Sequence, residues 1–306
     1  MPSYVYYQKK IMPLEEASMG LMINSIHYGT AVFEGIRGNW NANKKQLFLF
    51  RLEEHYERLL KGCQILKIDL PYTVEDLVRI TVDVVKQCGF EEDVYIRPMA
   101  YKSTEGLGVR LHNLEADFFV FAFPWGRYID VDKARCGVSS WRFPKEIARA
   151  KLSGLYITNA LAKTEAIENG FDEGIMLNAD GYIAEGTGEN LFLFVDGKLV
   201  TPATYDGCLI GITRGTVIKL AKDELGIDTV ERHIDRIELY SAAECFLTGT
   251  AAHIIPVVEI DRRKIGDGEI GKVTRQLQKL YLNAIQGELP AYSEWCKPVY
   301  SSTGLA

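Results

Sequence analysis

The fold class is decided by the stretch Glu185-Gly186-Thr187-Gly188-Glu189-Asn190-Leu191-Phe192-Leu193-Phe194-Val195. In a dinucleotide-binding fold, such a glycine-rich turn opens a helix, but this one runs into an apolar strand that ends at the hairpin signal Asp196-Gly197. The third glycine of that fingerprint is also missing, since Leu191 takes its place, and the chain has no G-K-[ST] phosphate loop. The stretch therefore disfavours a nicotinamide or ATP site.

Strands and helices alternate loosely on both sides of this stretch, with enough hairpin signals to predict an α+β fold instead of a doubly wound sheet. A polar segment after Pro124-Trp125-Gly126 predicts a domain boundary, giving domains at 1–124 and 136–306 joined by a loop at 125–135. Glu54 and Arg58 are expected to pair across one helix turn. The predicted helices cover 52–61, 74–88, 157–169, 213–225 and 272–285, and the main predicted strands cover 4–11, 47–50, 93–101, 116–123, 137–141 and 244–248.

The composition narrows the function classes. The 306 residues include 35 Lys and Arg against 41 Asp and Glu, a net charge of −6 that argues against a nucleic-acid or anionic-membrane surface. The longest apolar run, 118–123, is too short to cross a bilayer, and the start shows no secretory signal, so a cytoplasmic protein is expected. Six scattered cysteines without a C-x-x-C pair are expected to be reduced, and no metal site is expected.

Two turns and one arginine suit an anion. Gly211-Ile212-Thr213-Arg214-Gly215 runs directly into a helix, and Thr248-Gly249-Thr250-Ala251 follows a strand. Taken singly, each turn is better explained as a helix cap or a plain turn, but two such turns in one domain favour an anion site. Arg51 precedes a helix, where its charge opposes the helix dipole. A bound anion would resolve that misfit, and a solvated arginine or one paired with Glu54 or Glu115 is the alternative.

In Val94-Tyr95-Ile96-Arg97, the strand alternation places Tyr95 and Arg97 on one face, where a phenol and a guanidinium suit a carboxylate. The alternative is an edge-strand arginine that faces water. The pattern does not single out Lys151, Leu107 or Val109.

Several motifs recur together, in order, over nearly the whole chain. They are 28–37 (YGTAVFEGIR), 95–98 (YIRP), 123–126 (FPWG), Lys151 followed by Tyr156, 185–190 (EGTGEN), 211–214 (GITR) and 249–251 (GTA). The set resembles the branched-chain amino acid aminotransferases, class IV aminotransferases of the fold type IV pyridoxal-phosphate (PLP) enzymes. That resemblance implies a small α/β N-terminal domain, a larger C-terminal domain with a barrel-like sheet and a site at the domain interface.

The resemblance implies that Lys151 forms the internal aldimine with PLP and moves the proton between Cα and C4′. It implies that Tyr156 hydrogen-bonds the phenolic oxygen of the cofactor and that Glu185 pairs with the pyridine nitrogen, keeping it protonated. The implied phosphate ligands are Arg51, Ile212, Thr213 and Thr250.

For the substrate, the resemblance implies that Tyr95 and the Thr250-Ala251 turn receive the α-carboxylate and that Arg97 receives the γ-carboxylate of glutamate. A bare guanidinium facing an aliphatic side chain would be costly, so Arg97 is expected to bond a tyrosine such as Tyr28 or Tyr128. The implied lining of the side-chain pocket is Tyr28, Phe33, Gly35, Trp125 and Tyr128, with Leu107 and Val109 reaching in from a partner subunit, which implies at least a homodimer.

The implied activity is ping-pong transamination of leucine, isoleucine or valine with 2-oxoglutarate. A D-amino acid or (R)-amine transaminase and an aminodeoxychorismate lyase share the fold, and a non-enzymatic nucleotide-binding module on the paired glycines 186/188 and 106/108 is the alternative from another class. The chain departs from the family pattern at 142–149, which is shorter and more charged, and at 152–155, which is less rich in glycine. These departures put substrate breadth in question.

Overall fold

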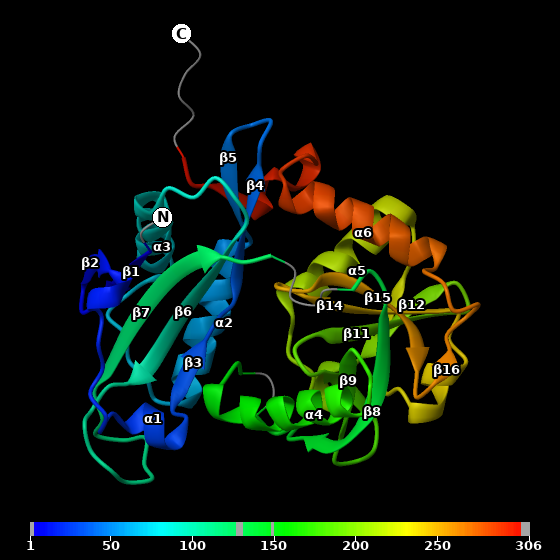
Figure 1. Ribbon diagram of the computed structural model, residues 1–306, viewed down its shortest axis with the longest axis horizontal. Helices are drawn as coiled ribbons and strands as arrows, with labels where there is room; N and C mark the ends of the chain where they lie inside the picture. Colours follow the sequence, from blue (N-terminus) through cyan, green and yellow to red (C-terminus); the bar gives the residue numbers. More distant parts are fainter. Residues whose placement is uncertain (1–2, 127–130, 148–149, 301–306) are drawn as a thin grey trace. The chain divides into compact units, whose positions relative to one another are not determined.

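The computed structural model describes residues 3–126, 131–147 and 150–300. The chain divides into two compact units, one formed by Met1–Gly126, Ala150–Gly154 and Asn283–Ala306, and the other by Arg127–Arg149 and Leu155–Leu282 (Figure 1). The sequence assigned all of 136–306 to one domain, and this division differs from that prediction. Residues 150–154 join the first unit because Leu152 bridges to Val32, and the C-terminal segment joins it through β17 (Cys296–Pro298), which pairs with β5 (Gln46–Phe50).

The first unit is built on an antiparallel sheet with strand order β17-β5-β4-β6-β7-β1-β2, in which β3 also pairs with β6. Helix α3 begins at a capping box between Thr73 and Asp76 and ends at Gly89, whose φ of 68° is the left-handed cap that glycine favours. The elements are β1 (Tyr4–Tyr7), β2 (Lys10–Pro13), α1 (Asn24–Tyr28), β3 (Ala31–Phe33), β4 (Ile36–Asn41), α2 (Leu52–Ile65), α3 (Val74–Cys88), β6 (Val94–Lys102) and β7 (Ala116–Pro124).

Two predictions for this unit are wrong. The strand expected at 4–11 is the hairpin β1–β2, because Gln8 and Lys9 take positive φ values of 48° and 62° and reverse the chain. Arg58 does not pair with Glu54 across the helix turn and instead binds Glu34. Helix α2 also extends about one turn beyond the predicted end at residue 61.

The second unit holds a mixed sheet with strand order β10-β9-β8-β15-β14-β11-β12-β13, which curls as a barrel-like sheet (Figure 1). The decisive stretch contributes β10 and β11, and β11 lies between β14 and β12, so the predicted strand is confirmed. The elements are β8 (Ala134–Phe143), α4 (Tyr156–Glu168), β9 (Glu173–Asn178), β10 (Ile183–Gly186), β11 (Asn190–Val195), β12 (Lys198–Pro202), α5 (Ile212–Leu225), β13 (Thr229–Arg232), β14 (Glu244–Gly249), β15 (His253–Ile260), β16 (Arg263–Lys264) and α6 (Lys272–Ile285), the last of which continues into the first unit.

Among the described residues, no helix is long and apolar enough to span a bilayer. All six cysteines are buried free thiols. The core of the second unit gathers the inward side chains of its sheet, including Ile175, Leu191 and Leu247.

Candidate active site

Lys151 lies against strand β3 in the first unit. The amide of Phe33 donates to the carbonyl of Lys151 at 3.1 Å, which fixes the lysine backbone beside the strand. Its Nζ lies 5.0 Å from the centroid of the Phe33 ring, within cation–π range. No sequence pattern selected this lysine, because the contact depends on a chain return of more than a hundred residues.

Arg97 contacts the same ring, with its guanidinium carbon 4.6 Å from the Phe33 centroid. Its Nη2 donates to the hydroxyl of Tyr95 at 3.0 Å, so the prediction that these two side chains share one face is confirmed. The edge-strand alternative is wrong, because β6 has a neighbour on each side. Arg97 is bonded to a tyrosine, as expected, but that tyrosine is Tyr95 and not Tyr28, whose hydroxyl accepts from the amide of Gly108. Tyr128, the other expected partner, lies outside the described residues.

Gly35 and Trp125 close around Tyr95. A Cβ at position 35 would lie 2.0 Å from the Tyr95 hydroxyl, so only glycine fits there without movement of the tyrosine. The Trp125 ring meets the Tyr95 ring edge-on at 4.5 Å between centroids. The structure thus brings Phe33, Gly35, Tyr95, Arg97, Trp125 and Lys151 into one neighbourhood of the first unit.

The loop that carries Leu107 and Val109 is tied to helix α1 through its backbone. The amide of Gly108 donates to Tyr28 at 2.9 Å, and its carbonyl accepts from Asn24 at 3.2 Å. The two apolar side chains are nevertheless 61% and 90% exposed in the single chain. A loop that is anchored while its apolar side chains face solvent is typical of a contact surface.

Arg51 pairs with Glu54, one of the alternatives that the sequence left open, through an Nε to Oε1 bond of 2.8 Å. It caps α2 with a left-handed φ of 51°, its amide donates to the carbonyl of Trp295 at 2.7 Å, and its guanidinium lies 5.3 Å from the Trp295 ring. The backbone geometry therefore holds Arg51 at the helix start, where backbone amides and positive charge together suit an anion.

A buried carboxylate that sequence reasoning missed lies between Phe33 and Gly35. Glu34 is fully buried and accepts from Arg58 at 2.6 and 2.7 Å and from His55 at 2.8 Å. Burial would raise its pKa, but the charge and hydrogen bonds of Arg58 outweigh burial and hold the pKa below the usual range. Burial lowers the pKa of His55, so it is neutral. The one available signal was an acidic residue within an otherwise apolar and small-residue run.

In the second unit, Glu185 is buried and fixed to the start of α5. Its Oε2 accepts from the amide of Leu209 at 2.8 Å and from Asn190 at 3.3 Å. A Cβ at Gly211, the residue before α5, would lie 2.0 Å from the side-chain oxygen of Asn190. Asn190 therefore packs against both the carboxylate and the helix terminus.

The start of α5 fits a phosphate. Its first turn has backbone N–H groups without acceptors inside the helix, no acidic residue and no side-chain cap. Thr248 pairs with Asn190 across the sheet, so both side chains emerge on one face, and its buried hydroxyl has no hydrogen-bond partner among the described residues. Thr213 is buried beside Tyr281 at 3.4 Å, while Thr250 and Ala251 are half-buried in the turn after β14. Tyr156 begins α4 and is half-buried.

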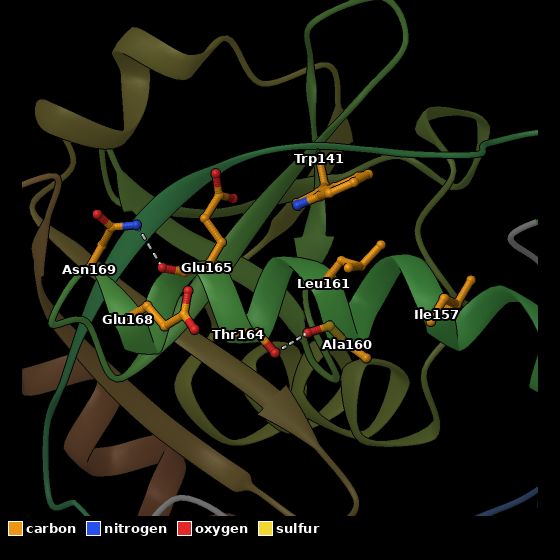
Figure 2. Close-up of a pocket in the computed structure, with 8 residues that line it drawn as sticks. All are labelled: Trp141, Ile157, Ala160, Leu161, Thr164, Glu165, Glu168 and Asn169. Atoms are coloured by element: carbon orange, nitrogen blue, oxygen red, sulfur yellow. Dashed lines mark hydrogen bonds between the residues drawn. The ribbon is translucent and has the colours of Figure 1, made fainter.

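A further open hollow lies beside α4 (Figure 2). Trp141, Ile157 and Leu161 give it an apolar floor, and Glu165 and Glu168 border it (Figure 2). None of the predicted site residues lines it.

The comparisons with known proteins show the family and the fold. The sequence profile of the family described as "Amino-transferase class IV" matches residues 31–260. A probable branched-chain-amino-acid aminotransferase of Aquifex aeolicus is 48% identical over 97% of both chains, and one of Synechocystis is 40% identical over 95% of both. The branched-chain aminotransferase of Thermoproteus uzoniensis, solved with norvaline, superposes with a TM-score of 0.93 at 41% identity over 98% of this chain and 100% of that one.

A second solved relative, the "T.th." branched-chain amino acid aminotransferase complexed with N-(5'-phosphopyridoxyl)-L-glutamate, gives a TM-score of 0.92 at 40% identity over 98% of this chain and 99% of that one. The fold type IV architecture inferred from the motifs is confirmed by these matches. The chain belongs to the class IV aminotransferases and, within them, to the branched-chain-amino-acid aminotransferases.

Proposed function

We propose that this PLP-dependent enzyme exchanges amino groups between L-leucine, L-isoleucine or L-valine and 2-oxoglutarate by a ping-pong mechanism. The observation that carries the proposal is the pair of cations around Phe33, with Lys151 at 5.0 Å and Arg97 at 4.6 Å from one ring. A lysine for amine chemistry and a guanidinium for a second carboxylate thus border the same apolar surface. The solved relatives bear norvaline in one case and a phosphopyridoxyl-glutamate in another.

The proposed residues fit PLP both at its pyridine ring and at its phosphate group. PLP supplies an electron sink for the carbanion that forms at the substrate Cα. The buried carboxylate of Glu185 holds a proton on the pyridine nitrogen, and Tyr156 donates a hydrogen bond to the phenolic oxygen. The phosphate is held by the first turn of α5 with Ile212 and Thr213, by Thr250 and by Arg51.

The proton steps fall to Lys151. Its Nζ would take the proton from the substrate Cα and deliver it to C4′ of the cofactor within one half-reaction, and the other half-reaction would reverse this transfer. A correctly placed base is worth ~10²–10⁴-fold in rate. The Phe33 ring covers one side of the lysine amine. The hydrogen bond from the Phe33 amide to the Lys151 carbonyl fixes the backbone from which the lysine side chain extends.

Recognition of two unlike side chains follows from the same neighbourhood. Tyr95 and the Thr250-Ala251 turn bind the α-carboxylate common to all substrates. Arg97 binds the γ-carboxylate of glutamate. When the substrate has an aliphatic side chain, the guanidinium of Arg97 keeps its hydrogen bond to the Tyr95 hydroxyl and its contact with the Phe33 ring. Tyr28, Gly35 and Trp125 complete the described part of the side-chain pocket.

We include in the proposal a cytoplasmic homodimer in which the 107–109 loop serves the site of the partner subunit. The exposure of Leu107 and Val109 on an anchored loop supports it. Mixing a Lys151→Ala chain with a chain carrying Leu107→Ser and Val109→Ser tests it, because each chain lacks what the other has. Activity recovered on mixing supports the shared loop, whereas two chains that stay inactive together contradict it.

The decisive test of the activity uses the purified protein. It should be yellow, and borohydride should bleach it and leave the cofactor on the peptide that contains Lys151. A panel of L- and D-amino acids and (R)-amines with 2-oxoglutarate then separates the alternatives of the same fold. A colourless protein without label at Lys151 would refute the enzyme and leave the nucleotide-binding module. Preference for D-substrates or (R)-amines, or a lyase product, would reassign the substrate.

A further inference from the structure

A second glutamate in the turn of Glu185 is buried without a cation partner. Glu189 is 3% exposed, and its Oε2 accepts one hydrogen bond, from the amide of Gly188 at 3.1 Å. Its Oε1 is buried and has no hydrogen-bond partner in the described part of the chain. An ionised carboxylate in such a place would lack most of the donors that it had in water.

Lys163, the cation whose charge acts on Glu189, is already engaged. Lys163 on α4 donates to Glu173 and to the carbonyl of Asp172, both at 2.7 Å. Glu173 is fully buried and also accepts from Thr187 at 2.5 Å, a residue of the same turn as Glu189. Among the described residues beside this turn, Lys163 is therefore bound to Glu173, and no hydrogen bond joins it to Glu189.

The groups that face Glu189 favour its protonation. Glu173 on β9 and Glu185 on β10 carry like charge, Lys163 on α4 partly offsets them, and Cys136 on β8 has a thiol whose pKa is raised by burial and by its acidic neighbours. Burial, followed by the charge of Glu173, raises the pKa of Glu189 well above the usual range.

We infer that Glu189 is a neutral carboxylic acid in the native protein and acts as a positioning residue for the turn that holds Glu185. Its oxygen accepts from Gly188, and its backbone carbonyl accepts from the amide of Gly186 at 2.7 Å, so it closes the turn without adding a negative charge. A charge on Glu189 would repel that on Glu185, four residues earlier, and make Glu185 more basic, so that the proton would shift from the pyridine nitrogen to Glu185 itself. This consequence rests on the proposed function, whereas the protonation of Glu189 does not.

The test compares the apparent Tm of the wild-type and Glu189→Gln holoenzymes from pH 4.5 to 8.5. Below the unfolded pKa of ~4.5, the glutamate is protonated in both states and the two proteins differ by a constant offset. As pH rises, the unfolded wild type releases a proton that the native state retains, so the wild type loses stability relative to the variant. We expect the Tm of Glu189→Gln minus that of the wild type to increase by a few degrees toward pH 8.

Infrared spectra give an independent readout, since the carbonyl stretch of a protonated carboxylic acid should be present in the wild type at pH 7.5 and absent from Glu189→Gln. Glu165→Gln is the matched control, because Glu165 accepts from Ser139 and Ser140 in the same unit and is not among the charges that raise the pKa of Glu189; it should lower Tm while leaving that band. If the glutamine variant does not fold, Glu189→Met provides the same comparison.

A Tm difference that is flat or falls with pH, or a band that the variant retains, would overturn the inference. Borohydride labelling of Lys151 in the wild type keeps the two questions apart. If Lys151 is labelled but the infrared band is absent, only the inference that Glu189 is neutral is refuted. If the band is present but Lys151 is not labelled, the proposed activity is refuted, together with the role of Glu189 in it.

Discussion

The Tyr95 hydroxyl occupies the space where a side chain at Gly35 would begin, only 2.0 Å from an ideal Cβ at that position. That hydroxyl also accepts from Arg97. One missing methyl group therefore sets the position of the phenol and, through it, the position of the guanidinium.

Replacing Gly35 by alanine should move Tyr95 and weaken its binding of the α-carboxylate. A hydrogen bond to a charged group contributes ~1.5–3 kcal/mol, so KM should rise about tenfold or more for every substrate, leucine and 2-oxoglutarate alike. Steady-state kinetics with both substrates check this. Tyr95→Phe, which removes the hydroxyl and keeps the glycine, should give the same unselective rise, and an unchanged KM in both variants would contradict the assignment of Tyr95.

Arg97→Met should produce a selective effect instead. In the proposed mechanism only dicarboxylate substrates bind the guanidinium, so KM for 2-oxoglutarate should rise at least tenfold more than KM for leucine. The methionine keeps the bulk of the stem, so the aliphatic pocket remains filled. Equal effects on both substrates, measured in the same two half-reactions, would refute the proposed role.

The parts of the fold with local signals were predictable. Helices α3 and α6 match the predicted 74–88 and 272–285 at both ends, and α3 does so because Thr73 and Gly89 carry the cap chemistry in the sequence. The hairpin at Gln8 and Lys9 was not predictable, because neither residue is a usual choice for positive φ.

The site needed information that local patterns lack. Lys151 approaches Phe33 through a backbone pairing across more than a hundred residues, and the motif resemblance supplied it where periodicity could not. The i, i+4 spacing in the helix predicted a pair between Arg58 and Glu54, but Arg58 binds the fully buried Glu34. The reason is that leaving a buried carboxylate unpaired costs far more free energy than leaving a solvated one unpaired. Residues 283–306 likewise join the first unit through strand pairing that depends on the tertiary fold.

Acid should destabilise the first unit through Glu34 and His55. Both have native pKa values below their ordinary ones, so the unfolded state binds protons that the native state refuses. The stability that these two groups contribute is fully present above pH ~6.5, the pKa of His55 in the unfolded chain. The contribution of His55 is lost as pH falls below that value, and that of Glu34 is lost as pH falls below ~4.5, its pKa in the unfolded chain. Urea unfolding at pH 7.5, 6 and 5 measures the loss, and His55→Gln should remove the part between pH 7.5 and 6.

Glu34→Gln at pH 7.5 should lower the free energy of unfolding by ~3–5 kcal/mol, since Arg58 keeps a buried charge without its carboxylate. Asp223→Asn is the matched surface control, because its pair with Lys219 is exposed, and it should change stability by less than ~0.5 kcal/mol. Equal effects of the two substitutions would show that the buried pair is not a major stabilising contact.

Gly211→Ala tests whether the Asn190 contact couples Glu185 to the start of α5. The new methyl would meet the Asn190 oxygen at 2.0 Å, so Asn190 must turn away and release its bond to Glu185. Both the carboxylate and the helix terminus are proposed cofactor ligands, and we expect the Kd for PLP, measured by titration of the apoenzyme, to rise more than tenfold. Gly89→Ala is the control: it strains a left-handed cap with open space around it, so it should lower Tm and leave that Kd unchanged. If both variants weaken PLP equally, general stability is responsible and the specific coupling is wrong.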